Sequence, residues 1–175
     1  IASMTAKYCE AIKEYPAKIL DTRKTTPGLR MLEKWAVLLG GGTNHRLSLS
    51  DGILIKDTHL TFLNSKGTNL MNACRQAKQY GSQDLQVCVE VETLEQIPHA
   101  LEGKADVLLL DNMTPEIVSQ AAIMIKGQAL IEVSGGIDIN NIRKFAACGV
   151  DYISVGAITH SAPSIDMSLE LDISN

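Results

Sequence analysis

The sequence predicts an α/β protein in which six parallel strands form an incomplete, TIM-like barrel. Short apolar segments alternate along the chain with longer segments whose apolar residues recur at helical spacing. Strands joined by helices in this way form a parallel sheet, which is either an open doubly wound sheet or a barrel. Polar side chains end nearly every expected strand, and a barrel gathers all such ends around one mouth. We therefore expect a barrel, incomplete because only six strands are visible.

Local signals place the individual elements. The expected strands are residues 17–22, 52–57, 85–92, 106–111, 129–134 and 151–156. The expected helices between them are residues 28–39, 67–80, 93–103, 114–127 and 138–149. Several of these helical segments begin at Thr or Asp and end at Gly, which are common capping residues. Residues 17–165 are therefore expected to form one barrel domain.

The third expected strand shows which of its faces is polar. Within residues 85–92, three valines lie on one face, and Cys88, Glu90 and Glu92 lie on the other. Side chains alternate across a strand, so this pattern fits helices outside the barrel and a polar mouth inside it. We expect the two carboxylates of this strand to face the mouth.

The composition limits the kinds of partner and compartment. A net charge of −4 argues against a general nucleic-acid or anionic-membrane surface, since both need a surplus of Lys and Arg across one face. The four cysteines form no CxxC pair, so neither a zinc site nor a disulfide framework is indicated. No signal-like start and no apolar run of about 20 residues is visible. A soluble protein of the reducing cytoplasm is expected.

Cationic residues gather in one short part of the chain. Residues 23–56 contain six of the sixteen Lys and Arg residues, namely Arg23, Lys24, Arg30, Lys34, Arg46 and Lys56. His45 lies among them, and three glycines at 40–42 let the backbone approach a ligand. The alternative interpretation is a glycine loop with solvated charges. Lys56 favours a local anion site, because it ends an apolar strand.

The last two expected strands end in small residues that suit a phosphate. Segments 132–137 (EVSGGI) and 154–161 (SVGAITHS) offer backbone N–H groups, and the helix expected from Asp138 adds its dipole. In barrel enzymes, the last two strand-to-helix loops are the usual phosphate site. A turn without a ligand explains each glycine pair equally well when it is taken alone.

Two carboxylates, Glu90 and Asp111, lie at the ends of neighbouring expected strands. Their oxygen atoms can coordinate Mg²⁺ or accept hydrogen bonds from ribose hydroxyl groups. The alternative is that they form salt bridges with Lys56 or Arg23. The mouth would thus offer a cationic end, two carboxylates and a glycine-lined end, which suits a phosphorylated sugar beside a small polyanion.

Six segments follow one another in a fixed order: DTRKTTPGLR (21–30), GGGTNHRLSLSDGILIKDTH (40–59), VEVE (89–92), LLLDN (108–112), EVSGGI (132–137) and GVDYISVGAITHS (149–161). Together they resemble the segments of the quinolinate phosphoribosyltransferases. The resemblance covers residues 1 to about 173. It implies a decarboxylating nicotinate-nucleotide pyrophosphorylase. Such an enzyme converts quinolinate and phosphoribosyl pyrophosphate into nicotinate mononucleotide, pyrophosphate and CO₂, with Mg²⁺, in de novo NAD biosynthesis.

The resemblance also implies a role for each residue of the mouth. The quinolinate carboxylates would be bound by Thr22, Arg23, His45, Arg46 and Lys56. The catalytic groups would be Lys24, Lys56, Glu90 and Asp111, of which Lys24 and the two carboxylates face the ribose, the pyrophosphate and the metal. The 5′-phosphate would be bound by Ser134, Gly135, Gly136, Gly156 and His160. Arg30 stays open, either in the mouth or on its rim.

The family pattern extends beyond the barrel. Residues 1–16 would be the last helix of an N-terminal α/β sandwich domain. The tail at 166–175, which alternates like an edge strand, would pair with that domain. A homodimer, or a higher homo-oligomer, would supply a further arginine from the partner. Two alternatives stay open, a non-catalytic anion-binding barrel and a phosphoribosyltransferase for a related base.

Overall fold

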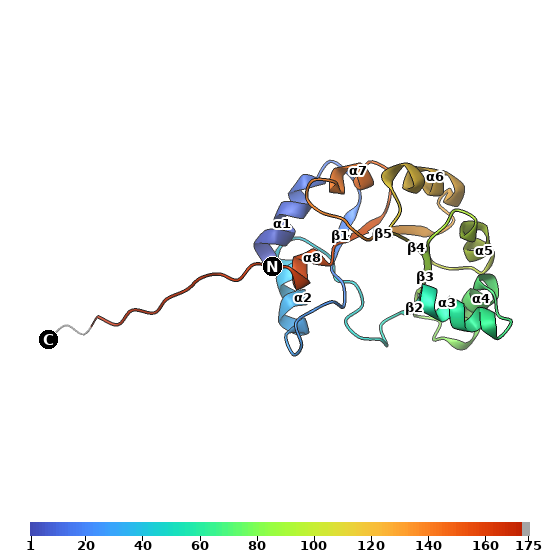
Figure 1. Ribbon diagram of the computed structural model, residues 1–175, viewed down its shortest axis with the longest axis horizontal. Helices are drawn as coiled ribbons and strands as arrows, with labels where there is room; N and C mark the ends of the chain where they lie inside the picture. Colours follow the sequence, from blue (N-terminus) through green and yellow to red (C-terminus); the bar gives the residue numbers. More distant parts are fainter. Residues whose placement is uncertain (173–175) are drawn as a thin grey trace.

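Six parallel strands form one curved sheet in the structure, a computed structural model that describes residues 1–172 (Figure 1). The strands are β1 (Lys18–Leu20), β2 (Ile53–Ile55), β3 (Val87–Val91), β4 (Val107–Asp111), β5 (Leu130–Ser134) and β6 (Tyr152–Ser154). Their order across the sheet is β1-β6-β5-β4-β3-β2. In the described part of the chain, β1 and β2 are the two edges, so the barrel is open between them. The predicted incomplete six-stranded barrel is confirmed.

Helices surround the sheet on its outer side (Figure 1). They are α1 (Ala2–Ala11), α2 (Arg30–Leu39), α3 (Asp57–Ser65), α4 (Leu70–Tyr80), α5 (Gln96–Glu102), α6 (Pro115–Ile125), α7 (Ile142–Ala146) and α8 (Ala157–His160). The five helices expected between the strands are present with shorter bounds, whereas α3 and α8 were not expected. The N-cap of α3 is Lys56, whose side chain cannot accept a hydrogen bond from the backbone. α8 has only four residues, too few to show a helical period.

The strands carry different side chains on their two faces. The three valines of β3 pack outward into the main core, beneath the helices. Burying each such side chain contributes about 1.5–3 kcal/mol to the free energy of folding. Cys88 faces inward and forms a small interior cluster with Val107 and Leu109. Glu90 is buried on the same face, and Glu92 follows the end of β3 and is exposed. The predicted polar interior is thus confirmed for Glu90 but not for Glu92.

The connection from α2 to β2 crosses the opening between the two sheet edges. Thr43 forms a parallel bridge with Leu20 of β1. Its N–H donates to the carbonyl of Ile19 at 2.8 Å, and its own carbonyl accepts from the N–H of Asp21 at 3.2 Å. We call residues 43–52 the crossing segment; it is the single connection visible between the β1 side and β2 in Figure 1. It pairs with β1 at Thr43 only and so narrows the opening without closing it.

A buried ion pair anchors the crossing segment. Asp21 is fully buried and Lys34 is 3% exposed, and Lys34 Nζ donates to Asp21 Oδ1 at 2.5 Å. The same oxygen accepts from the N–H of His45 at 2.8 Å, and Oδ2 accepts from Asn44 Nδ2 at 2.6 Å. Lys34 Nζ also donates to the carbonyl of His45 at 3.0 Å. The sequence groups Lys34 with the cations of the mouth. In the structure it instead binds Asp21 and the backbone of the crossing segment.

The two ends of the chain differ in how they meet the barrel. α1 packs against α2, β1 and α7, and it buries Tyr8 in the main core. Residues 162–172 have no helix or strand and extend away from the barrel (Figure 1). The tail strand expected at 166–175 stays a prediction, and its last three residues lie outside the described part of the chain. Among residues 1–172, no helix is long and apolar enough to cross a bilayer.

Replacing Lys34 with Met is expected to lower the free energy of unfolding by about 3–5 kcal/mol, because the change leaves the buried carboxylate of Asp21 without its cation. Urea titration followed by circular dichroism measures this loss. The control is Lys13→Met, which removes an exposed lysine paired with Glu10 and should change stability little. Similar losses in the two variants would contradict the anchoring role.

Candidate active site

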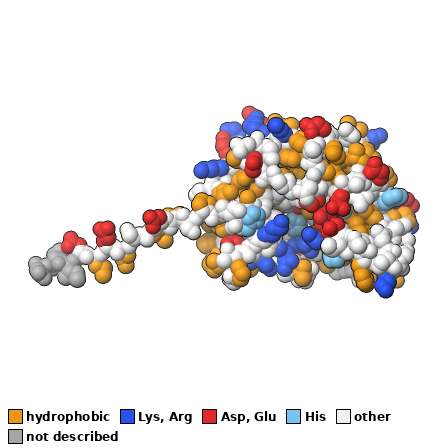
Figure 2. All heavy atoms as spheres, viewed as in Figure 1, with side chains coloured by type: hydrophobic (Ala, Val, Ile, Leu, Met, Phe, Trp, Pro, Cys, Tyr) orange, Lys and Arg blue, Asp and Glu red, His pale blue; other side chains and the backbone are white. Residues whose placement is uncertain are grey.

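A cavity of about 580 Å³ opens at the C-terminal ends of the strands. We call it the mouth cavity. It is lined by twelve of the predicted site residues, namely Thr22, Arg23, Lys24, His45, Arg46, Lys56, Glu90, Asp111, Ser134, Gly135, Gly136 and Gly156. Figure 2 shows Lys and Arg side chains meeting Asp and Glu side chains at a hollow in the centre of this face. The strand register explains the assembly, since it aligns Asp111 with Ser134 and Leu20 with Ser154.

Two arginines form the cationic end of the mouth cavity. Arg46 Nη1 donates to the carbonyl of Gly52 at 3.2 Å, which aligns the side chain along the crossing segment. The Nε atoms of Arg23 and Arg46 are buried and have no hydrogen-bond partner among the described residues. Burial lowers the pKa of Arg46, and the neighbouring charge of Arg23 lowers it further. Buried guanidinium N–H groups without a partner are donors that suit an anion.

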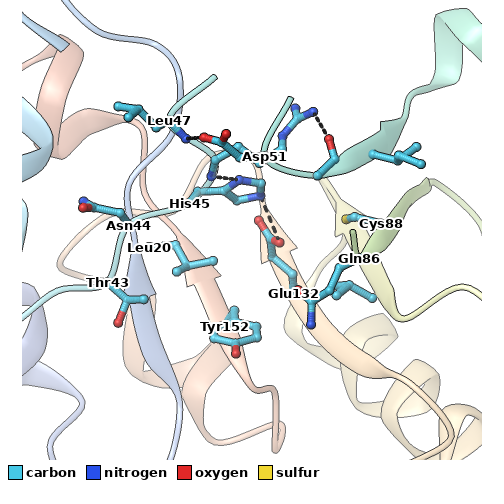
Figure 3. A pocket seen from close by; sticks show the side chains of 14 residues that line it. Leu20, Thr43, Asn44, His45, Leu47, Asp51, Gln86, Cys88, Glu132 and Tyr152 are labelled. Atoms are coloured by element: carbon cyan, nitrogen blue, oxygen red, sulfur yellow. Dashed lines mark hydrogen bonds and ion pairs between the residues drawn. The ribbon is translucent and has the colours of Figure 1, made fainter. Parts of the chain in front are cut away.

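His45 and Glu132 separate the mouth cavity from a second cavity below it. This seam pocket, of about 380 Å³, lies where the barrel is open between β1 and β2 and shares His45, Arg46 and Glu132 with the mouth cavity. Figure 3 shows the seam pocket with His45 and Glu132 pointing toward each other across it. Their Nε2 and Oε2 atoms are 3.4 Å apart. Apart from these three residues, Asp51 is the charged residue lining the seam pocket.

Glu90 and Lys56 form an ion pair at the middle of the mouth cavity. Lys56 Nζ lies 3.6 Å from Glu90 Oε2, and the lysine side chain is half exposed whereas the glutamate is nearly buried. Burial raises the pKa of Glu90; the charge of Lys56 opposes this shift and that of Asp111 adds to it. The salt bridge between Glu90 and Lys56, which the sequence left as an alternative, is therefore present. Asp111 lines the same cavity as this pair.

Asp111 is oriented by its neighbours on the strand ends. Its Oδ1 accepts from Ser134 Oγ at 2.5 Å, and its Oδ2 accepts from Asn112 Nδ2 at 2.6 Å. No group of three or more His, Cys, Asp or Glu residues within 1–172 is placed to hold a metal ion. Mg²⁺ usually takes one or two carboxylates, with water and substrate phosphates completing its octahedron. The pair Glu90 and Asp111 fits a Mg²⁺ ion of this kind, one that binds together with a phosphorylated substrate.

Three glycines that follow β5 and β6 also line the mouth cavity. Gly135 and Gly136 have φ of +92° and +59°, and a Cβ atom on Gly135 would lie 2.8 Å from the backbone nitrogen of Asn112. A Cβ atom on Gly156 would lie 2.9 Å from Nε2 of His160. The backbone here comes close to its neighbours, as a compact anion site requires. His160 does not line the mouth cavity; its ring lies behind Gly156, and its Nδ1 is 2.7 Å from Ser161 Oγ.

Arg30 lies on the rim and not in the mouth cavity. Its Nε donates to Thr25 Oγ1 at 3.0 Å, and its two Nη atoms donate to the carbonyls of Leu47 and Arg23 at 3.4 Å each. These contacts join the turn after β1 to the crossing segment. The question that the sequence left open for Arg30 is thus answered in favour of a structural role.

Three polar residues of the mouth cavity received no role from the sequence. Asn112, Glu132 and Ser154 line the cavity beside the predicted residues. Glu132 is 3% exposed, and its Oε1 accepts from Ser154 Oγ at 2.5 Å. The alternation of β5 contained a signal for it, because Glu132 is two positions before Ser134 and so shares its face. A lone glutamate within an apolar strand gives no indication of its partner, which lies 22 residues away.

Comparisons with known proteins identify the family. A family model described as "Quinolinate phosphoribosyl transferase, C-terminal domain" matches residues 1–170. A probable nicotinate-nucleotide pyrophosphorylase of Bacillus subtilis is 43% identical over 175 residues, covering 100% of this chain and 59% of that protein. Quinolinate phosphoribosyltransferase (decarboxylating) 1 of Nicotiana glauca is 39% identical over 190 residues, covering 98% of this chain and 53% of that protein.

A solved structure agrees with these relatives. The crystal structure of NadC from Streptococcus pyogenes superposes with a TM-score of 0.88 at 44% identity, over 97% of this chain and 58% of that one. The chain thus spans between half and two thirds of the length of the relatives it matches. With the open barrel and the mouth cavity described above, these matches show that the chain belongs to the quinolinate phosphoribosyltransferase family, in which it corresponds to the C-terminal domain.

Proposed function

We propose that the mouth cavity binds quinolinate and phosphoribosyl pyrophosphate and transfers the phosphoribosyl group to quinolinate with loss of CO₂. The observation that carries this proposal is the pair of buried, unpartnered Nε donors on Arg23 and Arg46. They lie in the same cavity as Lys56, two carboxylates and a glycine-lined end. The names of the relatives support the same reaction. The product would be nicotinate mononucleotide, as required for de novo NAD biosynthesis.

The cationic end suits the two carboxylates of quinolinate. Planar guanidinium groups match planar carboxylates in geometry, and the chain supplies two of them, Arg23 after β1 and Arg46 in the crossing segment. We place Thr22, His45 and Lys56 around the same ring, as the family resemblance implies. Nicotinate has a single carboxylate and would leave one buried cation without an anion, which is costly. The dicarboxylate is therefore the better fit, and a related base is the weaker candidate.

The other end suits the phosphoribosyl donor. Ser134, Gly135 and Gly136 would surround the 5′-phosphate together with Gly156, and His160 would support that wall. When bound by Glu90 and Asp111, Mg²⁺ would neutralise charge on the pyrophosphate as it leaves. Lys24 would face the same leaving group, since it lines the cavity and its carbonyl is fixed by Thr159 Oγ1 at 2.8 Å.

The chemistry needs positioning and electrostatic stabilisation more than covalent help. The bond between ribose C1 and pyrophosphate breaks with its electron pair leaving on oxygen, and the ring nitrogen of quinolinate forms the new bond to C1. Positive charge develops at C1 in this step, and the nearby carboxylates of Glu90 and Asp111 would stabilise it. The ribosylated ring then accepts the electron pair that CO₂ leaves at C2, and a proton replaces CO₂ there.

We further propose that the active enzyme is a homodimer. The exposed face of α2 supports this, because Met31, Leu32, Trp35 and Leu39 are each about 60% exposed or more. A contiguous apolar surface of this kind marks a protein contact. The partner would supply a further arginine to quinolinate.

A reducing compartment such as the cytoplasm fits the four free cysteines.

Calorimetric titration with quinolinate tests the central proposal. Heat of binding is expected for quinolinate, increased or retained when the phosphoribosyl donor is present with Mg²⁺. Quinolinate-dependent release of pyrophosphate, followed with a coupled assay, then tests turnover. Absence of heat with quinolinate, with and without the donor, would favour a non-catalytic scaffold.

Replacing Arg46 with Ala is expected to raise the dissociation constant of quinolinate by about 10- to 100-fold, since a charge-assisted contact contributes about 1.5–3 kcal/mol. The affinity for the phosphoribosyl donor should be retained, because Arg46 belongs to the other end of the cavity. Calorimetry with each ligand separately measures both constants.

The control for this variant is Arg75→Ala, which removes an exposed arginine paired with Glu102 outside the mouth cavity. It should bind both ligands as the unchanged protein does. Equal weakening of both ligands by the Arg46 variant would contradict the assigned division of the cavity.

Binding of the phosphoribosyl donor with Mg²⁺ is expected to weaken on the acid side at a pH above the ordinary glutamate pKa of about 4.3. Burial raises the pKa of Glu90, and a carboxylate is charged only above its pKa. As the pH falls, Glu90 therefore loses its charge, and donor binding weakens, at a higher pH than for an ordinary glutamate. Lys56→Met removes the cation that opposes this shift and should move the loss to higher pH. Measuring the affinity for the phosphoribosyl donor between pH 4 and pH 8 tests both statements.

Glu92→Gln is the matched control for this pH dependence. Glu92 is exposed, follows Glu90 by two residues and does not line the mouth cavity. Its removal should leave the pH profile unchanged, whereas Glu90→Gln should abolish the acid loss. A profile that is the same in all of these variants would exclude Glu90 as the titrating group.

A further inference from the structure

Glu132 is a buried carboxylate to which the proposed reaction assigns no role. It lies in the middle of β5, is 3% exposed, and lines both the mouth cavity and the seam pocket. Oε1 accepts from Ser154 Oγ, and Oε2 lies 3.4 Å from Nε2 of His45 (Figure 3). A carboxylate at this depth is costly unless both of its oxygen atoms have donors. Nε2 of His45 is the donor available to the second oxygen.

The other nitrogen of the same ring is also engaged. The backbone N–H of Arg46 donates to Nδ1 of His45, and the two nitrogens are 2.7 Å apart (Figure 3). A backbone amide can only donate, so Nδ1 must be an acceptor without a proton. A ring whose Nδ1 is unprotonated is neutral and carries its one proton on Nε2. The contact with the Arg46 N–H therefore requires this tautomer, and the Glu132 carboxylate beside Nε2 is an acceptor suited to its proton.

We propose that Glu132 is a positioning residue that holds His45 as the neutral Nε2–H tautomer in the wall between the two cavities. The charged groups around this ring come from four parts of the chain. Glu132 faces it from β5, Asp21 after β1 and Lys34 of α2 hold its backbone, and Arg46 follows it in the crossing segment.

The consequence concerns how the cationic end binds an anion. The fixed positive charge belongs to the arginines, while His45 contributes a neutral N–H donor and a rigid ring. Because Arg46 is bonded to that ring through its own backbone, the orientation of the ring also sets the start of the Arg46 side chain. Glu132 thus acts on the bound anion through His45 and Arg46. This consequence for quinolinate rests on the proposed function, whereas the tautomer does not.

Nitrogen NMR of protein labelled with ¹⁵N-histidine reads the tautomer directly. At pH 8, well above the ordinary histidine pKa of about 6.5, we expect His45 to show a protonated Nε2 and an unprotonated Nδ1. His45→Asn identifies the signals among those of the four histidines. A proton on Nδ1, or protons on both nitrogens, would overturn the proposal. The spectra need no substrate, so this result is separate from the outcome of the binding and turnover tests.

Three variants test the part played by Glu132. Glu132→Gln presents an amide that can donate as well as accept, so the ring is no longer held in the orientation that places Nδ1 against the Arg46 N–H. Both tautomers should then become populated, and the two ring signals should move toward each other. Glu132→Asp keeps an acceptor carboxylate and should keep the Nε2–H tautomer. Ser154→Ala removes only the other partner of Glu132 and should also keep it. Spectra of Glu132→Gln that match the unchanged protein, or loss of the tautomer in Glu132→Asp and Ser154→Ala alike, would overturn the assignment.

Binding gives a second readout. Glu132→Gln is expected to raise the quinolinate dissociation constant by about tenfold, as for the loss of one charge-assisted hydrogen bond. The constant for the phosphoribosyl donor should change by less than about twofold, because the donor occupies the other end of the cavity. Glu132→Asp should recover part of the quinolinate affinity. Equal losses for the two ligands would show a general structural role and overturn the positioning role.

Discussion

The buried carboxylate of Asp21 is the interaction on which the arrangement of the mouth depends. It follows β1 directly and accepts hydrogen bonds from Lys34 on α2 and from Asn44 and His45 in the crossing segment. A strand, a helix and a loop are thereby fixed to one point. In a closed barrel the ladder between the first two strands would fix their separation, but here the sheet is open there. Side-chain hydrogen bonds hold the crossing segment to β1 and α2 instead, and they determine where His45 and Arg46 line the mouth cavity.

The mouth cavity is organised by charge as much as by shape. The cationic residues follow β1 and β2 or lie in the crossing segment, Glu90 and Asp111 lie on β3 and β4, and the glycines follow β5 and β6. Free buried donors on Arg23 and Arg46 reduce stability in the unliganded protein. Such groups are retained where a ligand satisfies them, because local strain and unmet hydrogen bonds concentrate at functional sites. The core beneath the helices supplies the stability that offsets this cost.

The sequence was sufficient to predict the six strands, the open barrel and twelve residues of the mouth cavity, but it gave no role to Asn112, Glu132 and Ser154 and wrongly placed His160 there. Strand ends are easy to predict because each apolar run stops at a polar residue, as at Asp111 and Ser134, and parallel order then brings these ends together. It could not predict α3, whose start has no accepting cap, or the partners of Lys34 and Glu132. Lys34 bonds to Asp21 and His45, which lie 13 and 11 residues away, and Ser154 lies 22 residues from Glu132. Only the folded structure brings these partners into contact. Roles specific to this reaction came from the family resemblance rather than from spacing.

The opening between β1 and β2 bears on how small molecules could pass through the barrel wall. Parting the wall there breaks the contacts of one short segment, such as the bridge of Thr43 to β1, and leaves every strand pairing of the sheet intact. The seam pocket lies directly behind that segment. In the reaction proposed above, CO₂ is small and uncharged and would leave sideways through this wall. Its departure would then depend on how often the segment opens, while the charged substrates and products would use the mouth cavity.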